Sequence, residues 1–170
     1  MNTTYEFTVP VFVKHLGGVK IVLEKVEAFL KEKGMSEEEF LQSRMWEDMF
    51  PFVKQVQISC DNAKGAVARL AGMEVPKFED NEKTIAELQA RVDKTLEFVK
   101  SVPETAFSGA AEVKVSLPYW KEQYMTGHNY ARFYAFLNFL FHVSTAYDLA
   151  RKAGVPVGKS DYMNGNPLRD

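Results

Sequence analysis

The sequence contains one cysteine, Cys60, so no disulfide can form within the chain. Its first ten residues, MNTTYEFTVP, lack the basic and apolar regions of a secretory signal. Because a reducing compartment leaves a lone thiol free, we expect a cytoplasmic protein. The longest apolar run, FYAFLNFLF, has about half the length of a membrane helix and is followed by His142, so no membrane partner is expected.

Strong charge of one sign is also missing. The 21 basic and 23 acidic residues give a formal net charge of -2, and they alternate without forming a basic patch interleaved with aromatics. This excludes the usual basis for binding nucleic acid. The segment GVPVGKS at residues 154–160 resembles a phosphate-binding loop, but three residues separate its glycines where four are required. Nucleotide hydrolysis is therefore not expected.

The residues that are present favour an all-α protein with one domain spanning residues 1–170. A length of 170 residues with 46% hydrophobic and 26% charged side chains suffices for a core without disulfides. Apolar residues recur at spacings of three and four, which predicts long amphipathic helices. The expected helices cover about residues 12–30, 50–70, 85–102 and 128–152. Four such helices predict a four-helix bundle.

Capping signals support these boundaries. Gly34 follows the first helix where a C-cap glycine belongs, and Ser36 with Glu39 predicts the start of a short helix. Thr84 and Glu87 form the same pattern before the third helix. Alternation of apolar and polar residues within 112–125 predicts a small β-hairpin before the last long helix. We expect residues 73–82 to be an irregular connection and residues 160–170 an irregular tail.

The fourth helix is apolar nearly all round. Phe133 and Leu137 lie on one side, whereas Ala131, Ala135 and Leu149 lie on the other. Neighbouring helices cover only one side of a bundle helix, so the hairpin or a second subunit must cover the rest. A homodimer is the favoured expectation, and coverage by the hairpin alone is the alternative.

Asn138 and His142 are the leading site candidates. They are four residues apart, so they point the same way from a helix and could hold one metal ion or one substrate group. An amide oxygen is a poor ligand for zinc or nickel, however. The favoured alternative is a core histidine whose hydrogen bond is supplied by Asn138 or by the hydroxyl of Thr145.

Two other histidines carry less weight. His15 lies at the edge of the apolar stripe of the first helix and could join His142. Gly17 and Gly18 follow it, and two glycines in a helix cost about 2 kcal/mol relative to alanine, which predicts close approach of the hairpin or a partner, with a kink or a later helix start as alternatives. His128 lies at a helix start, where an exposed position is the expectation.

No carboxylate of the second helix is clearly directed toward the core. Asp61 points away from its apolar stripe, so we expect a solvated residue or an ion pair with Lys64 worth less than about 1 kcal/mol. Cys60 lies on the stripe, where it is expected to be a small buried apolar residue and not a nucleophile.

Several blocks in order carry a resemblance over nearly the full length. They are Val9-Pro10-Val11-Phe12, Asp48-Met-Phe-Pro51, Gln55-Val-Gln57, Asp61-Asn-Ala-Lys64, Arg69-Leu-Ala-Gly72, Val75-Pro76, Phe78-Glu-Asp80, Asn138 to His142, Ala146-Tyr147 and residues 154–159. On these blocks the sequence resembles a domain-of-unknown-function family of mostly bacterial proteins within the DinB/YfiT-like superfamily.

The resemblance implies an up-down-down-up four-helix bundle, frequent dimerisation and a pocket at one end. Superfamily members of known activity hold a divalent metal with three histidines, and several are thiol-dependent transferases. In this sequence Asn138 stands where the first histidine of the fourth-helix pair would be and His142 matches the second. The second helix has no histidine, and Gln55 is its loose counterpart.

Two functions remain open on these residues. The favoured one is a small-molecule-binding protein that is non-catalytic or only weakly metal-dependent, with His142, Asn138, His15 and Gln55 lining its metal or ligand pocket. The alternative is a DinB-type thiol transferase or hydrolase that holds nickel, zinc or manganese with a divergent ligand set.

Overall fold

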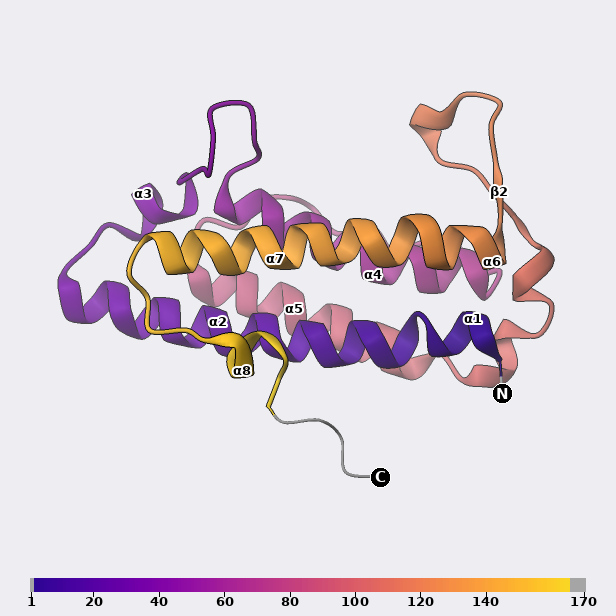
Figure 1. Cartoon of the computed structure of the whole chain (residues 1–170), viewed down its shortest axis with the longest axis horizontal. Helices are drawn as coiled ribbons and strands as arrows, with labels where there is room; N and C mark the ends of the chain where they lie inside the picture. The colour runs from indigo at the N-terminus through magenta and orange to yellow at the C-terminus, as the bar shows by residue number, and fades with distance from the viewer. Residues whose placement is uncertain (1, 166–170) are drawn as a thin grey trace.

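The chain is described here by a computed structural model that covers residues 2–165 (Figure 1). Its long helices are α2 (Val9–Lys33), α4 (Phe52–Leu70), α5 (Ile85–Ser101) and α7 (Phe136–Lys152). Shorter helices are α1 (Thr3–Glu6), α3 (Glu37–Leu41), α6 (Gly127–Tyr130) and α8 (Lys159–Tyr162), with 3-10 turns η1 (Glu104–Phe107), η2 (Ala110–Glu112) and η3 (Pro118–Trp120). A π-helical segment, η4 (Ala131–Ala135), joins α6 to α7. Strands β1 (Lys114–Val115) and β2 (Met125–Thr126) form the hairpin.

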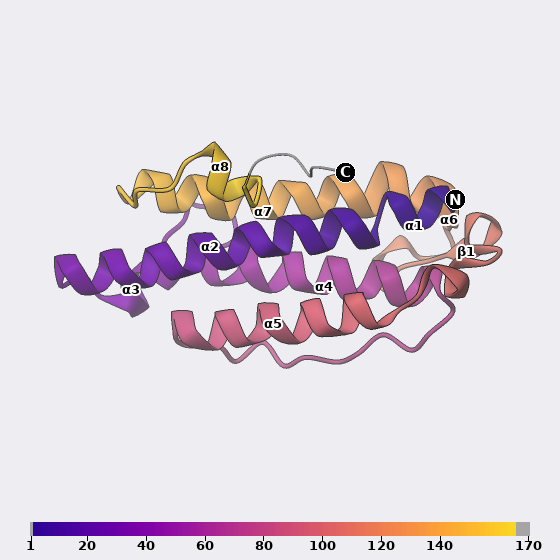
Figure 2. The same ribbon diagram turned by 90° about the horizontal axis from the view of Figure 1, so that it is seen from below.

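The four long helices lie side by side in a bundle (Figures 1 and 2). α4 and α5 run in one direction because the connection between them returns along the bundle, whereas α2 and α7 run in the other (Figure 2). This is the up-down-down-up order that the resemblance implied. Their facing sides form one apolar core, with fully buried Phe12, Leu23, Phe52, Leu88 and Phe139. Packing of these faces supplies most of the stabilisation of such a bundle.

The predicted caps are present. Gly34 ends α2 in the left-handed conformation with φ 63°, and the Ser36 hydroxyl accepts from the Glu39 amide. The Thr84 side chain and the Glu87 carboxylate form a complete capping box at α5. In the second helix, the boundary predicted near residue 50 moves to Phe52, because Pro51 has extended geometry and acts as the N-cap.

The hairpin is shorter than the alternating pattern suggests. Only two residues on each side pair, Lys114 with Thr126 and Val115 with Met125. The chain turns into η3 directly after Leu117, which removes the following residues from the ladder. Residues 116–124 therefore project from the bundle as a loop (Figure 1).

The C-terminal segment, and not the hairpin, explains the glycine pair of α2. A Cβ on Gly18 would collide with the Tyr162 carbonyl, and one on Gly17 would collide with the Asn164 side chain. The tail predicted to be irregular contains α8, which packs on α2 at this point. Part of the predicted tail, residues 166–170, lies outside the described residues. Within the described part, no helix combines the length and apolar character needed to span a membrane.

Candidate functional site: a polar ladder between α4 and α7

His142 lies on α7 with 7% of its surface exposed, facing α4. Its Nδ1 is 2.7 Å from Oε1 of Gln55, and Nε2 of Gln55 donates to the carbonyl of Phe50 at 2.9 Å. Because the amide nitrogen of Gln55 donates to the Phe50 carbonyl, its amide oxygen faces the imidazole ring. An amide oxygen can only accept a hydrogen bond, so the imidazole proton is assigned to Nδ1. Burial lowers the pKa of His142 to about 4, so the ring is neutral near pH 7. Nε2 keeps its lone pair and has no hydrogen-bond partner among residues 2–165.

Asn138 lies one turn before His142, as the spacing predicted, but it has a different partner. Its Nδ2 donates to Oδ1 of Asn62 at 2.9 Å. The other amide nitrogen of this pair, Nδ2 of Asn62, is buried and has no partner within the described part of the chain. The α4–α7 interface therefore contains one free acceptor on His142 and one free donor on Asn62.

A third contact extends the series toward the hairpin. The Arg69 guanidinium lies near the hydroxyl of Tyr130, a residue that is 2% exposed. Burial raises the pKa of Tyr130, and the Arg69 charge opposes that shift. The six residues that make these contacts form the polar ladder: Gln55, Asn62 and Arg69 on α4, with His142, Asn138 and Tyr130 on α6 and α7.

The spacing of the ladder follows from helix geometry. Its α4 residues are seven apart, which is two turns, so all three lie on one stripe. The π-helical segment η4 lies between Tyr130 and Asn138. π-helical turns inside α-helices are frequent at functional sites. The polar ladder and this segment together mark the α4–α7 interface as the candidate site.

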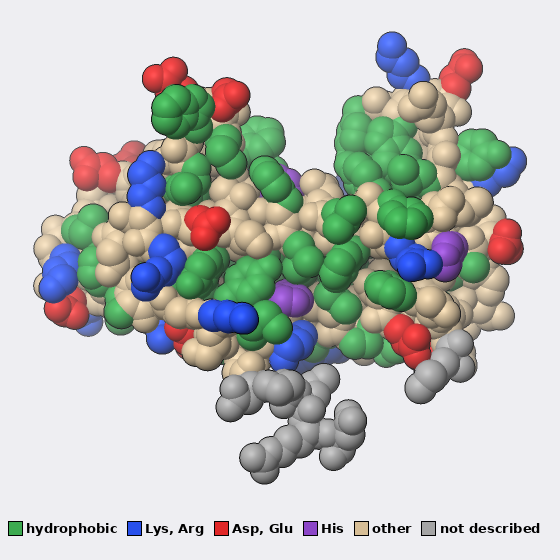
Figure 3. Space-filling model, viewed as in Figure 1, with side chains coloured by type: hydrophobic (Ala, Val, Ile, Leu, Met, Phe, Trp, Pro, Cys, Tyr) green, Lys and Arg blue, Asp and Glu red, His purple; other side chains and the backbone are tan. Residues whose placement is uncertain are grey.

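Both ends of the ladder connect to a projecting loop. At one end Gln55 donates to Phe50, which belongs to residues 42–51 between α3 and α4. At the other end Tyr130 stacks on Tyr134, whose hydroxyl shares a hydrogen bond with Tyr119 of the 116–124 loop. Both loops project to the same side of the bundle (Figure 1). Figure 3 shows the surface hollowed between them, with hydrophobic side chains on both projections.

The structure brings His142 and Gln55 together and places His15 elsewhere. His15 lies on α2, with its ring centroid 5.3 Å from that of Tyr162 and 6.5 Å from that of Phe139. Burial lowers its pKa, although the nearby Tyr162 carbonyl opposes the shift. His15 therefore faces the C-terminal segment. His128, at the start of α6, lies 3.1 Å from Nη1 of Arg132.

These residues do not fit the three-ligand metal site that the superfamily resemblance implied. Among residues 2–165, no cluster of three or more His, Cys, Asp or Glu side chains is placed to hold a metal ion. Gln55 uses both ends of its amide within the chain, and Asn138 is hydrogen-bonded to Asn62. Cys60 is buried, which raises the pKa of its thiol to about 11 and keeps it protonated at neutral pH.

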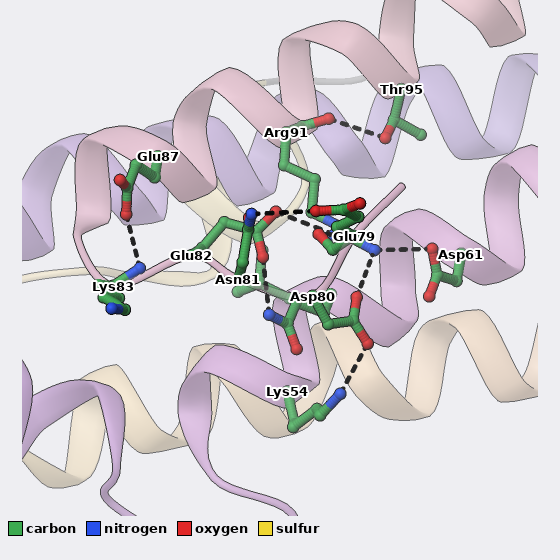
Figure 4. A network of polar contacts seen from close by, with 12 residues as sticks. Lys54, Asp61, Glu79, Asp80, Asn81, Glu82, Lys83, Glu87, Arg91 and Thr95 are labelled. Atoms are coloured by element: carbon green, nitrogen blue, oxygen red, sulfur yellow. Dashed lines mark hydrogen bonds and ion pairs between the residues drawn. The ribbon is translucent and has the colours of Figure 1, made fainter. Parts of the chain in front are cut away.

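A second polar cluster, of which the sequence predicted only the pairing of Asp61 with Lys64, holds the long α4–α5 connection (Figure 4). The guanidinium of Arg91, with a side chain 2% exposed, pairs with Asp61 at 2.8 Å, Asp80 at 2.9 Å and Glu82 at 2.9 Å. It also donates to the Glu79 carbonyl at 3.0 Å. These contacts fix residues 79–82 against α4 and α5.

Further cations complete this Arg91 cluster. Lys64 pairs with Asp61 at 3.0 Å although its side chain is only 6% exposed, and Lys54 pairs with Asp80 at 2.7 Å. The three cations and three carboxylates of this cluster balance in charge. Most of the ion pairs join one segment of the chain to another. We therefore regard the cluster as structural. The only sequence signal for it was the block from Asp61 to Lys64 together with the acidic run near Asp80.

Comparison with known proteins agrees with the fold. The family model described as "Domain of unknown function (DUF1993)" matches residues 4–163. A crystal structure of a DinB family member protein from Shewanella denitrificans superposes with a TM-score of 0.91 and 39% sequence identity, covering 98% of this chain and 94% of that one. No curated protein sequence matches the chain. The matched residues include the polar ladder and the Arg91 cluster. The chain therefore belongs to the DUF1993 family and has the DinB-like fold.

Proposed function

We propose that the chain binds a small molecule above the polar ladder, in the hollow between its two projecting loops. The observation that carries this proposal is the neutral His142, held by Gln55 with Nε2 free to accept a hydrogen bond. Asn62 offers a buried donor in the same interface. An unpaired buried group such as Nδ2 of Asn62 is costly unless something binds it. A ligand that offers this nitrogen an acceptor and donates to Nε2 of His142 fits the interface.

Binding without a tightly held metal fits these residues better than catalysis through one. A neutral imidazole with a fixed tautomer can ligate a metal, but the chain offers no second and third ligand beside it within the described residues. The single free cysteine is consistent with work in a reducing cytoplasm, which we include in the proposal.

The test follows the His142 ring directly. Protein labelled with 15N in histidine is titrated with a fragment set of small amides, carboxylic acids, phenols and thiols. We expect at least one compound to move the Nε2 resonance and to raise the melting temperature. The same compound should have no effect on His142→Gln and a full effect on His128→Gln. If every compound that binds the wild type acts equally on His142→Gln, the proposal is contradicted.

A metal analysis separates the enzyme alternative. Untagged protein should contain less than stoichiometric nickel, zinc and manganese. A stoichiometric metal that is lost in His142→Ala would replace the binding proposal with a metal-dependent transferase or hydrolase.

A homodimer is part of the same proposal. Phe133, Leu137 and Phe141 are four residues apart along η4 and α7 and are 61%, 53% and 55% exposed. The hairpin leaves these three side chains uncovered in the single chain. A second copy that buries this stripe accounts for a helix that is apolar all round.

A further inference from the structure

The loop of the hairpin carries a cavity that neither the ladder nor the core uses. It has a volume of about 460 Å³ and is lined by Trp120, Glu122, Gln123, Tyr124, Met125 and Tyr134. Three of its six lining residues are aromatic, and one is acidic. We propose that this cavity binds the quaternary ammonium group of a small molecule. The proposal does not depend on ligand binding at His142.

The aromatic residues form a corner. The rings of Trp120 and Tyr134 are perpendicular, at 88°, with their centroids 4.8 Å apart. Tyr124, with 53% of its surface exposed, adds a third aromatic side chain to the lining. Aromatic faces carry negative charge density that attracts a cation within about 6 Å, and cages of several rings suit ammonium groups that carry methyls and cannot donate hydrogen bonds.

One carboxylate lines the cavity. Glu122 has no ion-pair or hydrogen-bond partner for its side chain among residues 2–165, so its carboxylate is available to a ligand. The Lys114 ammonium lies 4.7 Å from the centroid of the Tyr124 ring, so a ligand's ammonium group takes the place of this resident cation or binds on the Trp120 and Tyr134 side of the cavity. Lys121 lines an adjoining cavity with Tyr119 and does not line this one.

The loop is held in place before any ligand arrives. The Trp120 amide donates to the Leu117 carbonyl at 2.8 Å, and the Gln123 amide donates to the Trp120 carbonyl at 3.0 Å. The Ser116 hydroxyl donates to the Gln123 carbonyl at 2.8 Å. Tyr134 is fixed from below by stacking on the buried Tyr130. A pre-organised cage loses less entropy when it binds a ligand.

The test uses choline and its uncharged isostere, 3,3-dimethylbutan-1-ol. The chain has two tryptophans, so Trp46→Phe leaves Trp120 as the only tryptophan and its fluorescence reports on the cavity. We expect choline to change this fluorescence saturably and to bind at least about tenfold more tightly than the isostere. Equal binding of both compounds, or no binding of choline, overturns the proposal.

Variants assign the binding to this corner. Tyr124→Leu and Glu122→Gln should each weaken choline binding severalfold, whereas Tyr124→Phe and the distant surface variant Glu97→Gln should not. Choline binding that all four variants retain overturns the assignment. Flotation with phosphatidylcholine vesicles distinguishes the source of the group: binding of free choline alone indicates a free solute, and vesicle binding that choline reverses indicates a lipid headgroup. Both of these outcomes support the ammonium chemistry.

Discussion

The His142 ring is neutral in the folded chain because burial disfavours its charged form. Its pKa is about 4 when folded and 6.5 when exposed. Between these values the unfolded chain takes up a proton that the folded chain excludes, so stability falls as pH drops from about 6.5 to 4. The loss attributable to this residue should be about 2 kcal/mol between pH 7 and pH 4.5, measured by urea unfolding at both pH values.

The contribution of His142 is isolated by difference. His15 also has a lowered pKa and acts in the same direction, so the wild type alone does not separate them. The variant His142→Gln cannot titrate at this position, and its stability should depend less on pH over this window. If His142→Gln and the wild type lose the same stability between pH 7 and 4.5, the ring is not held neutral by the fold.

Sequence spacing could predict one side of the ladder but not the other. Asn138 and His142 point the same way because they are four residues apart on a helix. Their partners, Asn62 and Gln55, lie 76 and 87 residues away in the chain. Helical periodicity fixes which residues share a face, but it does not say which face of another helix meets them. The three α4 residues of the ladder are seven apart in the sequence, but only the register of α4 against α7 shows that they face the same neighbour.

At the scale of the element, the packing of α8 on α2 predicts how substitutions in the glycine pair affect stability. Its docking needs a position on α2 without a side chain, since a Cβ on Gly18 would collide with the Tyr162 carbonyl. Alanine normally stabilises a helix interior by up to about 1 kcal/mol relative to glycine. Gly18→Ala should instead destabilise the chain by about 1–3 kcal/mol and expose the C-terminal segment to protease.

The matched control is another glycine near the same segment. Gly158 has an ordinary φ of -133°, and a Cβ there would meet no atom within 4 Å. Gly158→Ala should leave the unfolding midpoint and the protease pattern unchanged. Equal midpoints for Gly18→Ala and the wild type would mean that α8 does not pack on α2 in solution.

The Arg91 cluster makes a second prediction at this scale, for the connection between α4 and α5. Removing a buried charge from its partners leaves those partners uncompensated. Arg91→Met should therefore destabilise the chain by about 3 kcal/mol, measured by urea unfolding, and should accelerate hydrogen exchange in residues 79–82. Lys20→Met is the matched control, because Lys20 pairs with Asp93 at the exposed surface and its loss should cost less than about 1 kcal/mol.

Local signals predict elements unevenly, and the reason is physical. The long helices and their caps could be predicted because each depends on residues within one or two turns, as at Thr84 and Glu87. The α8 helix has four residues, too few for a periodic pattern, and it is stabilised by contacts with α2 such as the Lys25–Asp161 ion pair at 2.8 Å. The sequence predicted the Asp61–Lys64 pair but not the contacts of Arg91, because these join three separate segments.

For the whole molecule, apolar periodicity predicts a bundle of four helices, and the order of the helices follows from the long α4–α5 connection (Figure 2). That connection has no periodic pattern of its own, so its length alone does not reveal that it returns along the bundle. The Arg91 cluster ties it down there. One apolar surface stays uncovered in the single chain, the stripe of Phe133, Leu137 and Phe141.

A homodimer that buries this stripe gives the last prediction. Sedimentation equilibrium should yield about twice the chain mass at micromolar concentration, because burial of three large side chains on each copy removes several hundred Å² of apolar surface from water. Leu137→Glu places a charge in the middle of the stripe and should give a monomer. Its helical signal should persist, since Leu137 is 53% exposed in the single chain. Trp46→Glu is the control: this residue is 71% exposed on the other projection, so it should leave the dimer intact. A wild type that stays monomeric at 100-fold higher concentration, or a Leu137→Glu variant that remains a dimer, would show that another surface, or no second copy, covers α7.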